Sequence, residues 1–261
     1  MTNIVVLVKQ VPDTYSERKL SGADNTLDRE SADAVLDEIN EKAVEEALKI
    51  KEAGEGEVTV VSVGPDRATD AIRKALSMGA DKAIHVSDAA LHGSDAIATA
   101  KVLAAAISKV EGFDLVITGN EASDGRGGAV PAIIAELLGL PQLTHVNELT
   151  VDGTSIKADR YTEDGVTHLE ANLPAVVSVG EKINEPRYPS FKGIMAAKKK
   201  PVETLTVADL GVDAAEVGLG NAWSSVLEAS PKPPRTAGER VEDEGDGGSK
   251  VAAYLVAQKL I

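Results

Sequence analysis

The chain of 261 residues contains no cysteine. This excludes disulfide bonds, thiolate metal sites and cysteine nucleophiles from its chemistry. Aromatic residues are also scarce, with one tryptophan, four tyrosines and two phenylalanines. The hydrophobic core must therefore be built mainly from aliphatic side chains. Apolar residues of all kinds make up 43% of the chain, which is typical of a globular protein.

Long hydrophobic runs and an excess of basic residues are missing as well. No apolar run approaches the roughly 18 residues of a membrane-spanning helix. The first residues, MTNIVVLVKQV, lack the basic segment and cleavage site of a signal peptide. The net charge of −15 disfavours nucleic acid and anionic membranes as main partners. A simpler interpretation is that the acidic residues only keep the chain soluble. We expect a cytoplasmic protein without direct membrane insertion.

A catalytic arrangement is not recognisable either. The four histidines are scattered and form no HxxxH or HExxH pattern: His85, His92, His145 and His168. No GxSxG nucleophile elbow occurs, and most carboxylates fall on helix surfaces that we expect to be solvated. We therefore predict no catalytic residues and no metal site, and interpret the chain as a binding protein rather than as an enzyme.

Apolar runs rich in β-branched residues alternate with helical patterns in the first half of the chain. The runs predict strands buried on both faces of a parallel sheet, at residues 4–11, 58–63, 82–86 and 115–118. The helical patterns cover residues 32–53, 67–78, 95–110 and 130–138. This alternation indicates right-handed crossovers and an α/β fold with a doubly wound, mainly parallel sheet.

From about Thr144 the sequence pattern changes, and apolar and polar residues alternate in three segments. The three alternating segments are residues 148–151, 155–161 and 167–173. Asp152-Gly153 and Asp164-Gly165 separate them, which is typical of hairpins. Residues 175–179 (AVVSV) then return to the pattern of a buried strand. We expect antiparallel strands added to the parallel ones, giving a mixed sheet.

The chain after Pro201 has a different composition. PKPPR at residues 231–235 and VEDEGDGG at residues 241–248 indicate an extended arm. Residues 249–261 predict a terminal helix, with Ser249 as its candidate cap. We thus expect an α/β nucleotide-binding domain over residues 1–200 and an arm with a helix over 201–261. That helix docks either on its own domain or on a partner.

The segment GNEASDGRGGAVP, residues 119–131, joins a predicted strand to a predicted helix. Its glycines allow close backbone approach to a ligand, and the start of the following helix favours an anion. In a doubly wound fold a nucleotide phosphate would sit here, outside the carboxyl ends of the strands. The segment matches neither GxGxxG nor Walker A, so a glycine-rich turn without a ligand remains an alternative. Residues 62–65 end a neighbouring strand and could form the opposite wall.

The segment NEPRYPSFKGIMAAKKKP, residues 184–201, concentrates large apolar side chains in a chain that has few. These side chains are Tyr188, Phe191, Ile194 and Met195. Three residues oppose a regular element there: Pro186, Pro189 and Gly193. The basic run of residues 198–200 follows directly. We interpret residues 184–200 as an exposed loop without regular structure.

Residues 171–201, ANLPAVVSVGEKINEPRYPSFKGIMAAKKKP, closely resemble the signature of electron transfer flavoprotein β-subunits. Four other segments agree with that family: VLVKQVPD at 6–13, AVEEAL at 43–48, ALSMGADKAIHV at 75–86 and PPRTAG at 233–238. The resemblance covers nearly the whole chain and points to the bacterial, catabolic-type subgroup. It implies an adenine-nucleotide hydrolase-like fold.

The resemblance also implies partners and cofactors. The family forms heterodimers in which the α-subunit carries most of the FAD site, while the β-subunit helps to hold FAD and buries a structural AMP. Electrons arrive from acyl-CoA dehydrogenases, as in fatty acid β-oxidation. They leave to a membrane-bound quinone oxidoreductase or a similar acceptor. By this resemblance, residues 201–261 pack on the α-subunit.

Site residues follow from the same resemblance. The implied nucleotide-binding residues are Leu7, Val8, Lys9, Ile39, Asn40, Val63, Gly64, Gly119, Ala122, Asp124, Gly125, Gly127, Gly128, Ala129 and Val130. Residues 184–200 resemble the recognition loop that binds partner dehydrogenases, which implies contacts by Pro186, Arg187, Tyr188, Phe191, Ile194 and Met195. Phe191 matches the apolar residue, commonly leucine, that enters a pocket on the dehydrogenase.

Three alternatives remain open. The chain could be a bifurcating-type subunit with a second FAD in place of AMP, a stand-alone module of the universal-stress-protein kind, or an adenine-nucleotide hydrolase. The last two explain neither the apolar segment 184–200 nor the C-terminal arm, so both features favour an electron carrier.

Overall fold

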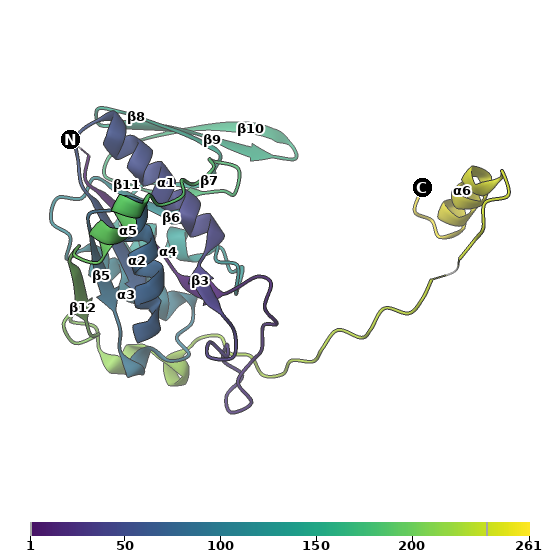
Figure 1. Cartoon of the computed structure of the whole chain (residues 1–261), viewed down its shortest axis with the longest axis horizontal. Helices are drawn as coiled ribbons and strands as arrows, with labels where there is room; N and C mark the ends of the chain where they lie inside the picture. Colours follow the sequence, from purple (N-terminus) through teal and green to yellow (C-terminus); the bar gives the residue numbers. More distant parts are fainter. Residues whose placement is uncertain (1, 239) are drawn as a thin grey trace. The chain divides into compact units, whose positions relative to one another are not determined.

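A seven-stranded sheet forms the centre of the compact unit Met1–Leu227, and a second unit comprises Glu228–Ile261. The computed structural model describes residues 2–238 and 240–261. The strand order is β12-β5-β4-β1-β6-β11-β7, and all neighbouring strands are parallel (Figure 1). The strands are β1 (Ile4–Leu7), β4 (Val58–Val63), β5 (Lys82–Val86), β6 (Leu115–Gly119), β7 (Gln142–Val146), β11 (Ala175–Val179) and β12 (Val202–Leu205).

Helices cover both faces of this sheet, which confirms the doubly wound α/β fold. Ile4 and Val6 of β1 belong to one core and Val5 and Leu7 to the other, because successive side chains of a strand point to opposite faces. The first core is closed by α1 (Glu38–Ala53), α2 (Thr69–Met78) and α5 (Phe191–Ala197). The second is closed by α3 (Ala96–Ile107) and α4 (Val130–Leu138). Short 3-10 helices lie at Asp66–Ala68, Ala89–Leu91, Ala214–Glu216 and Leu219–Asn221.

The strand order reverses beside β1. The chain places β4 and β5 on one side of β1 and then returns to place β6 on the other side. Crossovers that leave in opposite directions open a crevice at the carboxyl ends of the strands. The fold therefore brings the segments that follow β1, β4 and β6 to one edge of the sheet.

The antiparallel strands form a sheet of their own, so the expectation of one mixed sheet was wrong in this detail. The order is β10-β9-β8, with β8 (Glu148–Asp152), β9 (Ser155–Thr162) and β10 (Gly165–Asn172). The parallel ladder with β11 is irregular at His145, whose φ is 57°, and its last pair is Val146 with Val179. Asn147 N then bonds to Asp159 O at 2.8 Å, so the chain continues along β9 instead of along β11.

A small two-stranded sheet changes the start of the first predicted helix. The single strand predicted at residues 4–11 is two strands in the structure, β1 and β2 (Gln10–Pro12). β2 pairs with β3 (Ala34–Leu36). The predicted helix 32–53 therefore begins only at Glu38, where Asp37 provides its N-cap.

Residues 184–200 contain the helix α5, where the sequence predicted no regular element. Pro189 lies before the helix, and Ser190 caps it by accepting a hydrogen bond from Gly193 N at 3.0 Å. Gly193 packs against α2, where an added Cβ would lie 2.4 Å from Ser77 O. The glycine therefore permits close packing and does not interrupt the helix.

The first unit continues beyond residue 200, where the sequence suggested a boundary. β12 adds to the edge of the sheet by pairing with β5. An irregular segment then contains the only tryptophan, Trp223, whose side chain is 85% exposed. Its backbone N donates to Asp95 Oδ2 at 2.7 Å, which fixes this segment to the start of α3.

The second unit contains the helix α6 (Gly247–Ala257), which starts slightly before the predicted Ser249. Asp246 lies at its N-cap position, and its carboxylate pairs with Lys250 at 2.9 Å. Apolar side chains of this helix are exposed, among them Val251, Tyr254 and Val256. Within the described residues, no helix combines the length and apolar character needed to cross a bilayer.

Replacing Gly119 by alanine tests how tightly β6 packs on α1. An added Cβ would lie 2.6 Å from Asn40 Nδ2 and 3.0 Å from Ile39 Cγ2. We expect Gly119→Ala to lower the free energy of unfolding by about 1–3 kcal/mol in urea denaturation, as overpacking does. Gly125→Ala is the matched control, because nothing lies within 4 Å of a Cβ there. Equal stability of the two variants would contradict this packing argument.

Candidate functional site

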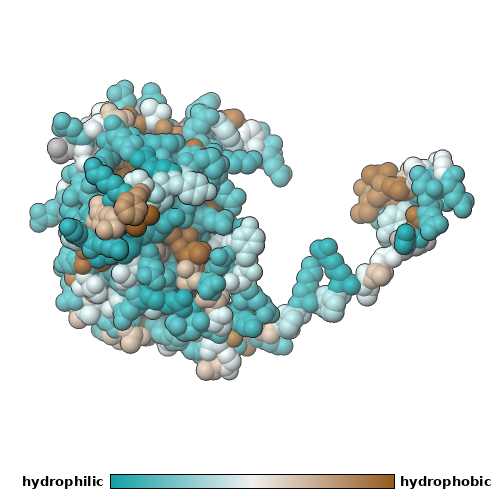
Figure 2. Space-filling model, in the orientation of Figure 1, coloured by the Kyte–Doolittle hydropathy of each residue, from teal (hydrophilic) through white to brown (hydrophobic). Residues whose placement is uncertain are grey.

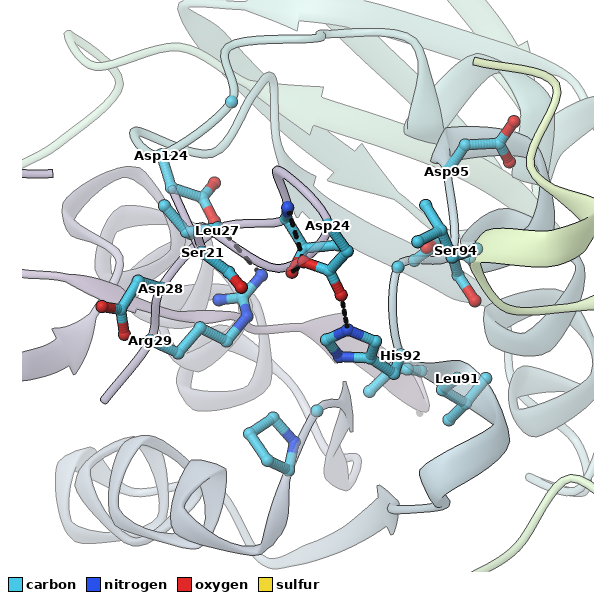
Figure 3. A pocket seen from close by; sticks show the side chains of 18 of the residues that line it. Ser21, Asp24, Leu27, Asp28, Arg29, Leu91, His92, Ser94, Asp95 and Asp124 are labelled. Atoms are coloured by element: carbon cyan, nitrogen blue, oxygen red, sulfur yellow. Dashed lines mark hydrogen bonds and ion pairs between the residues drawn. The ribbon is translucent and has the colours of Figure 1, made fainter. Parts of the chain in front are cut away.

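A cavity of about 1170 Å³ lies at the carboxyl ends of the strands around β1 (Figure 3). It is lined by Lys9 after β1, by Gly64 after β4, by Asp88 after β5 and by Asp124 in the loop after β6. Residues 20–21 and 24–30 line its other side. This is the place where open α/β sheets bind ligands, since the strand order reverses there.

Asp124 fixes the glycine-rich loop to two cations beside the cavity. Its carboxylate is only 3% exposed, and Oδ1 accepts a hydrogen bond from Lys9 Nζ at 2.8 Å. Oδ2 lies 3.6 Å from Arg29 Nη2 (Figure 3). A buried carboxylate is tolerated only when it is paired. Both cations also line the cavity, where they offset the charge of Asp124 and form the basic part of a lining that is otherwise rich in carboxylates.

Asp37 is fully buried and joins this loop to the start of α1. Its Oδ1 accepts hydrogen bonds from Ile39 N at 3.0 Å and Asn40 N at 3.1 Å, and its Oδ2 accepts one from Ser123 N at 2.7 Å. Asn40 Oδ1 in turn accepts a hydrogen bond from Lys9 N at 2.7 Å. These bonds connect β1, α1 and the loop after β6, and we call Asp37, Asn40 and Ser123 the crevice frame.

The two helix starts near the cavity differ in their capacity to bind an anion. The first amides of α1 are occupied by Asp37. At the start of α4 no side chain caps the amides, and the N-cap residue is Ala129. Uncapped amides at a helix start favour a negative ligand. Ser123 Oγ, close to this helix start in sequence, is buried and lacks a hydrogen-bond partner among the described residues, but Ser123 does not line the cavity.

Acidic side chains also line the cavity, and internal hydrogen bonds satisfy several of them. Asp24 Oδ2 lies 2.8 Å from His92 Nε2, and its Oδ1 accepts bonds from Thr26 N and Oγ1 (Figure 3). The bond to His92, followed by those to Thr26, holds the pKa of Asp24 well below its usual range. In residues 2–238 and 240–261, no group of three or more His, Cys, Asp or Glu side chains is arranged to hold a metal ion.

The residues implied by the sequence fall into three groups. Those lining the cavity are Lys9, Val63, Gly64, Asp124 and Gly125. Those buried in the structure around it are Leu7, Val8, Ile39, Asn40 and Gly119. Those of the loop and the start of α4, outside the cavity lining, are Ala122, Gly127, Gly128, Ala129 and Val130. Gly128 has the positive φ expected of this loop, 63°.

Sequence reasoning missed Arg29, Asp24 and His92. Arg29 and Asp24 come from the irregular segment between β2 and β3, and His92 follows the 3-10 helix Ala89–Leu91. The length of the segment between β2 and β3 was the available signal, because long loops in compact domains are usually functional. Neither residue type nor spacing indicated which of its side chains reach the cavity.

A second candidate site lies on α5 and the residues before it. Tyr188 is 94% and Phe191 80% exposed, and Ile194 and Met195 are about half exposed. We call these four residues the apolar patch, and Figure 2 shows hydrophobic surface over α5. Exposed apolar clusters of this kind mark interaction sites. No residue of 184–200 lines the cavity, so the two candidate sites are separate.

The lysine run beside the apolar patch divides into two parts. Lys198 and Lys199 are exposed. Lys200 turns inward and donates hydrogen bonds to Leu76 O at 3.0 Å and Ala80 O at 2.5 Å. Burial lowers the pKa of the Lys200 amine. Two of the three lysines are therefore accessible to a partner, and the third fixes the end of the segment to α2.

The electron transfer flavoprotein domain family matches residues 24–210. The chain is 65% identical to the electron transfer flavoprotein subunit beta of Mycobacterium tuberculosis (strain ATCC 25618 / H37Rv), over the full length of both chains. It is 42% identical to the same subunit of Thermoanaerobacterium thermosaccharolyticum, over 91% of each chain. It is 36% identical to the caffeyl-CoA reductase-Etf complex subunit CarD of Acetobacterium woodii, over 98% of this chain and 97% of the relative.

The chain belongs to the electron transfer flavoprotein β-subunit family. The resemblance seen in the sequence is thereby confirmed, together with a role in electron transfer by a flavoprotein. The matched range contains the loop after β6 and the apolar patch, and it ends before the second unit. The apolar patch lies wholly within the matched range, and the cavity lies mostly within it, with Lys9 among the lining residues outside.

Removing the Asp37 carboxylate tests the crevice frame. Asp37→Ala deletes the N-cap of α1 and the bond to Ser123 N together. We expect the free energy of unfolding, measured in urea, to fall by about 2 kcal/mol. Asp33→Ala is the control, since the described residues give its exposed side chain no hydrogen bond, and its effect should stay within about 0.5 kcal/mol. A loss no larger than that of the control would show that the frame does not depend on Asp37.

Proposed function

We propose that the chain is the β-subunit of a heterodimeric electron transfer flavoprotein. It buries a structural AMP in the cavity and helps to hold an FAD that the α-subunit mostly carries. Electrons pass from acyl-CoA and related dehydrogenases to a membrane-bound quinone oxidoreductase or a similar acceptor. The observation that supports this most strongly is the presence of two separate sites on one domain, a polar cavity at the strand ends and an exposed apolar patch.

The residues present suit an adenine mononucleotide. Val63 and Pro65 offer apolar surface to a base. Gly125 offers a backbone N–H group at the cavity, and Gly127 and the uncapped start of α4 follow outside the lining, where a phosphate extending from the cavity would meet their N–H groups. Lys9 and Arg29 add positive charge beside them. In this proposal AMP is a structural ligand that fills the crevice between the strand ends, and the chain supplies no catalytic group of its own.

A second candidate is a bifurcating-type subunit that binds a second FAD in place of AMP. The cavity of about 1170 Å³ is larger than the roughly 300–1,000 Å³ typical of small-ligand sites. It therefore has room for a dinucleotide as well. One relative, from Acetobacterium woodii, is named as a subunit of a caffeyl-CoA reductase-Etf complex, which makes the choice of nucleotide worth testing.

Partner binding fits the physics of a shared electron carrier. Transient redox complexes have small interfaces, and a single apolar residue in a pocket can supply most of the binding energy. Phe191 at the centre of the apolar patch suits that role. A flavin domain on the α-subunit could then search for a productive orientation while the patch keeps the donor nearby. The exposed Val251, Tyr254 and Val256 of α6 suit docking of residues 228–261 on the α-subunit.

Identifying the bound nucleotide separates the candidates. The chain is co-expressed with the α-subunit, purified, denatured and analysed by chromatography. Equal amounts of AMP and FAD support the proposed carrier, and two FAD with no AMP support the bifurcating type. A monomeric, colourless preparation with neither nucleotide contradicts both.

Arg29→Gln tests whether the Arg29 guanidinium contributes to nucleotide binding. We expect this variant to weaken retention of the nucleotide about tenfold, because a charge-assisted contact to phosphate is lost. Equilibrium dialysis of the heterodimer measures this retention. Arg18→Gln is the matched control in the same segment, with an exposed side chain. Unchanged retention in both variants would remove Arg29 from the proposed site.

Phe191→Ala tests the apolar patch. We expect the KM for a donor dehydrogenase to rise about tenfold or more, because an exposed aromatic at an interface centre can contribute over 1 kcal/mol. The melting temperature should stay unchanged, since the side chain is exposed. Steady-state transfer from the dehydrogenase measures the effect, with Tyr161→Ala near the end of β9 as control. An unchanged rate at limiting donor concentration would contradict docking through Phe191.

A further inference from the structure

Arg187 lies at the start of the segment that carries the apolar patch, yet its charge is directed inward. Its guanidinium pairs with Glu45 through Nε at 2.8 Å and Nη2 at 3.0 Å. It also pairs with Glu52, through Nη1 and through Nη2 at 2.9 Å. The backbone N of Arg187 donates to Glu45 Oε2 at 3.1 Å. We call Arg187, Glu45 and Glu52 the arginine clamp.

The clamp fixes the segment to α1. Glu45 and Glu52 lie two helical turns apart on that helix, so both face the same side. The Glu45 side chain is only 7% exposed, and a buried carboxylate needs a paired cation. Two-point pairing of guanidinium with carboxylate fixes orientation as well as distance. Arg187 donates hydrogen bonds from all three guanidinium nitrogens to these two partners and is therefore poorly placed to contact a docking protein.

Other contacts fix the remainder of the segment. At its start, Asn184 Nδ2 donates to Lys42 O at 3.0 Å, and Lys42 Nζ donates to Asn184 O at 2.8 Å. At its end, Arg73 Nη1 donates to the carbonyl oxygens of Ala197 at 2.6 Å and Lys200 at 2.8 Å. The segment is thus tied to α1 at one end and to α2 at the other. Between these ties, the patch side chains extend outward together with polar ones such as Glu185 and Lys192.

We propose that Arg187 is a positioning residue for docking. The arginine clamp holds the chain before α5 in one conformation, so that Tyr188 and Phe191 are presented in the geometry that a partner binds. A loop that had to become ordered on binding would lose affinity to conformational entropy. This inference rests on the proposed docking function of the apolar patch and assigns to Arg187 an indirect part in it.

The decisive variants are Arg187→Gln and Glu52→Gln in the co-expressed heterodimer. We expect Arg187→Gln to raise the KM for a donor dehydrogenase about tenfold and to leave kcat unchanged. The reason is that a few side chains that become mobile in the variant must be ordered again when the partner binds. Glu52→Gln should raise KM in the same direction, and the double variant should match Arg187→Gln alone. Arg187→Lys should fall between wild type and Arg187→Gln, because lysine keeps the charge but not the two-point pairing.

Two controls separate positioning from general loss of stability. Leu103→Ala opens a cavity in the opposite core and should lower the melting temperature without changing KM. Lys101→Gln, on α3, removes a surface pair with Glu216 and should change neither quantity. Amide hydrogen exchange gives a readout independent of any partner. In Arg187→Gln, the amides of Gly193 and Ile194 should exchange faster than in wild type.

The possible results distinguish this inference from the function on which it rests. If Phe191→Ala raises KM while Arg187→Gln and Glu52→Gln do not, docking through the patch stands and the positioning role of Arg187 is wrong. If Glu52→Gln leaves KM unchanged or lowers it while Arg187→Gln raises it, Arg187 contacts the partner directly and the inference is overturned. If Phe191→Ala also leaves KM unchanged, both the docking function and the inference fail.

Discussion

A buried carboxylate must be hydrogen-bonded, and Asp37 accepts three hydrogen bonds from backbone amides of two segments. One oxygen caps α1, and the other binds Ser123 N in the loop after β6. Because Asn40 also holds Lys9 N, the end of β1 takes its position from the same helix start. The cavity therefore has walls whose spacing is set before any ligand arrives, as preorganised binding requires.

The sequence predicted the central sheet well because buried parallel strands leave a strong local signal. The runs at 58–63, 82–86 and 175–179 coincide with β4, β5 and β11, since β-branched residues buried on both faces need no alternation. The segment with α5 was misjudged for a tertiary reason. Gly193 is required by the close approach of Ser77 O on α2, and no local pattern distinguishes a packing glycine from a helix breaker.

In the candidate site, too, some residues could be predicted from local sequence patterns and others depend on tertiary contacts. Lys9, Gly64 and Asp124 follow directly from topology, because the ends of parallel strands meet at one edge. Arg29 and His92 reach the cavity from irregular segments, whose paths depend on contacts distant in sequence. Likewise, an arginine in a segment of this kind is expected to be solvated, but Arg187 pairs with Glu45 and Glu52. A charged residue in a sequence reveals its sign, whereas its partner is known only from the fold.

The single tryptophan has a practical consequence. Trp223 is exposed where the first unit nears its end, although its backbone is fixed to Asp95. An indole in water emits at longer wavelength than one in an apolar contact. The chain thus carries a built-in optical probe near the origin of the C-terminal unit. Any contact that covers this indole can be followed in the isolated chain by intrinsic fluorescence, without a label and against a background of only four tyrosines.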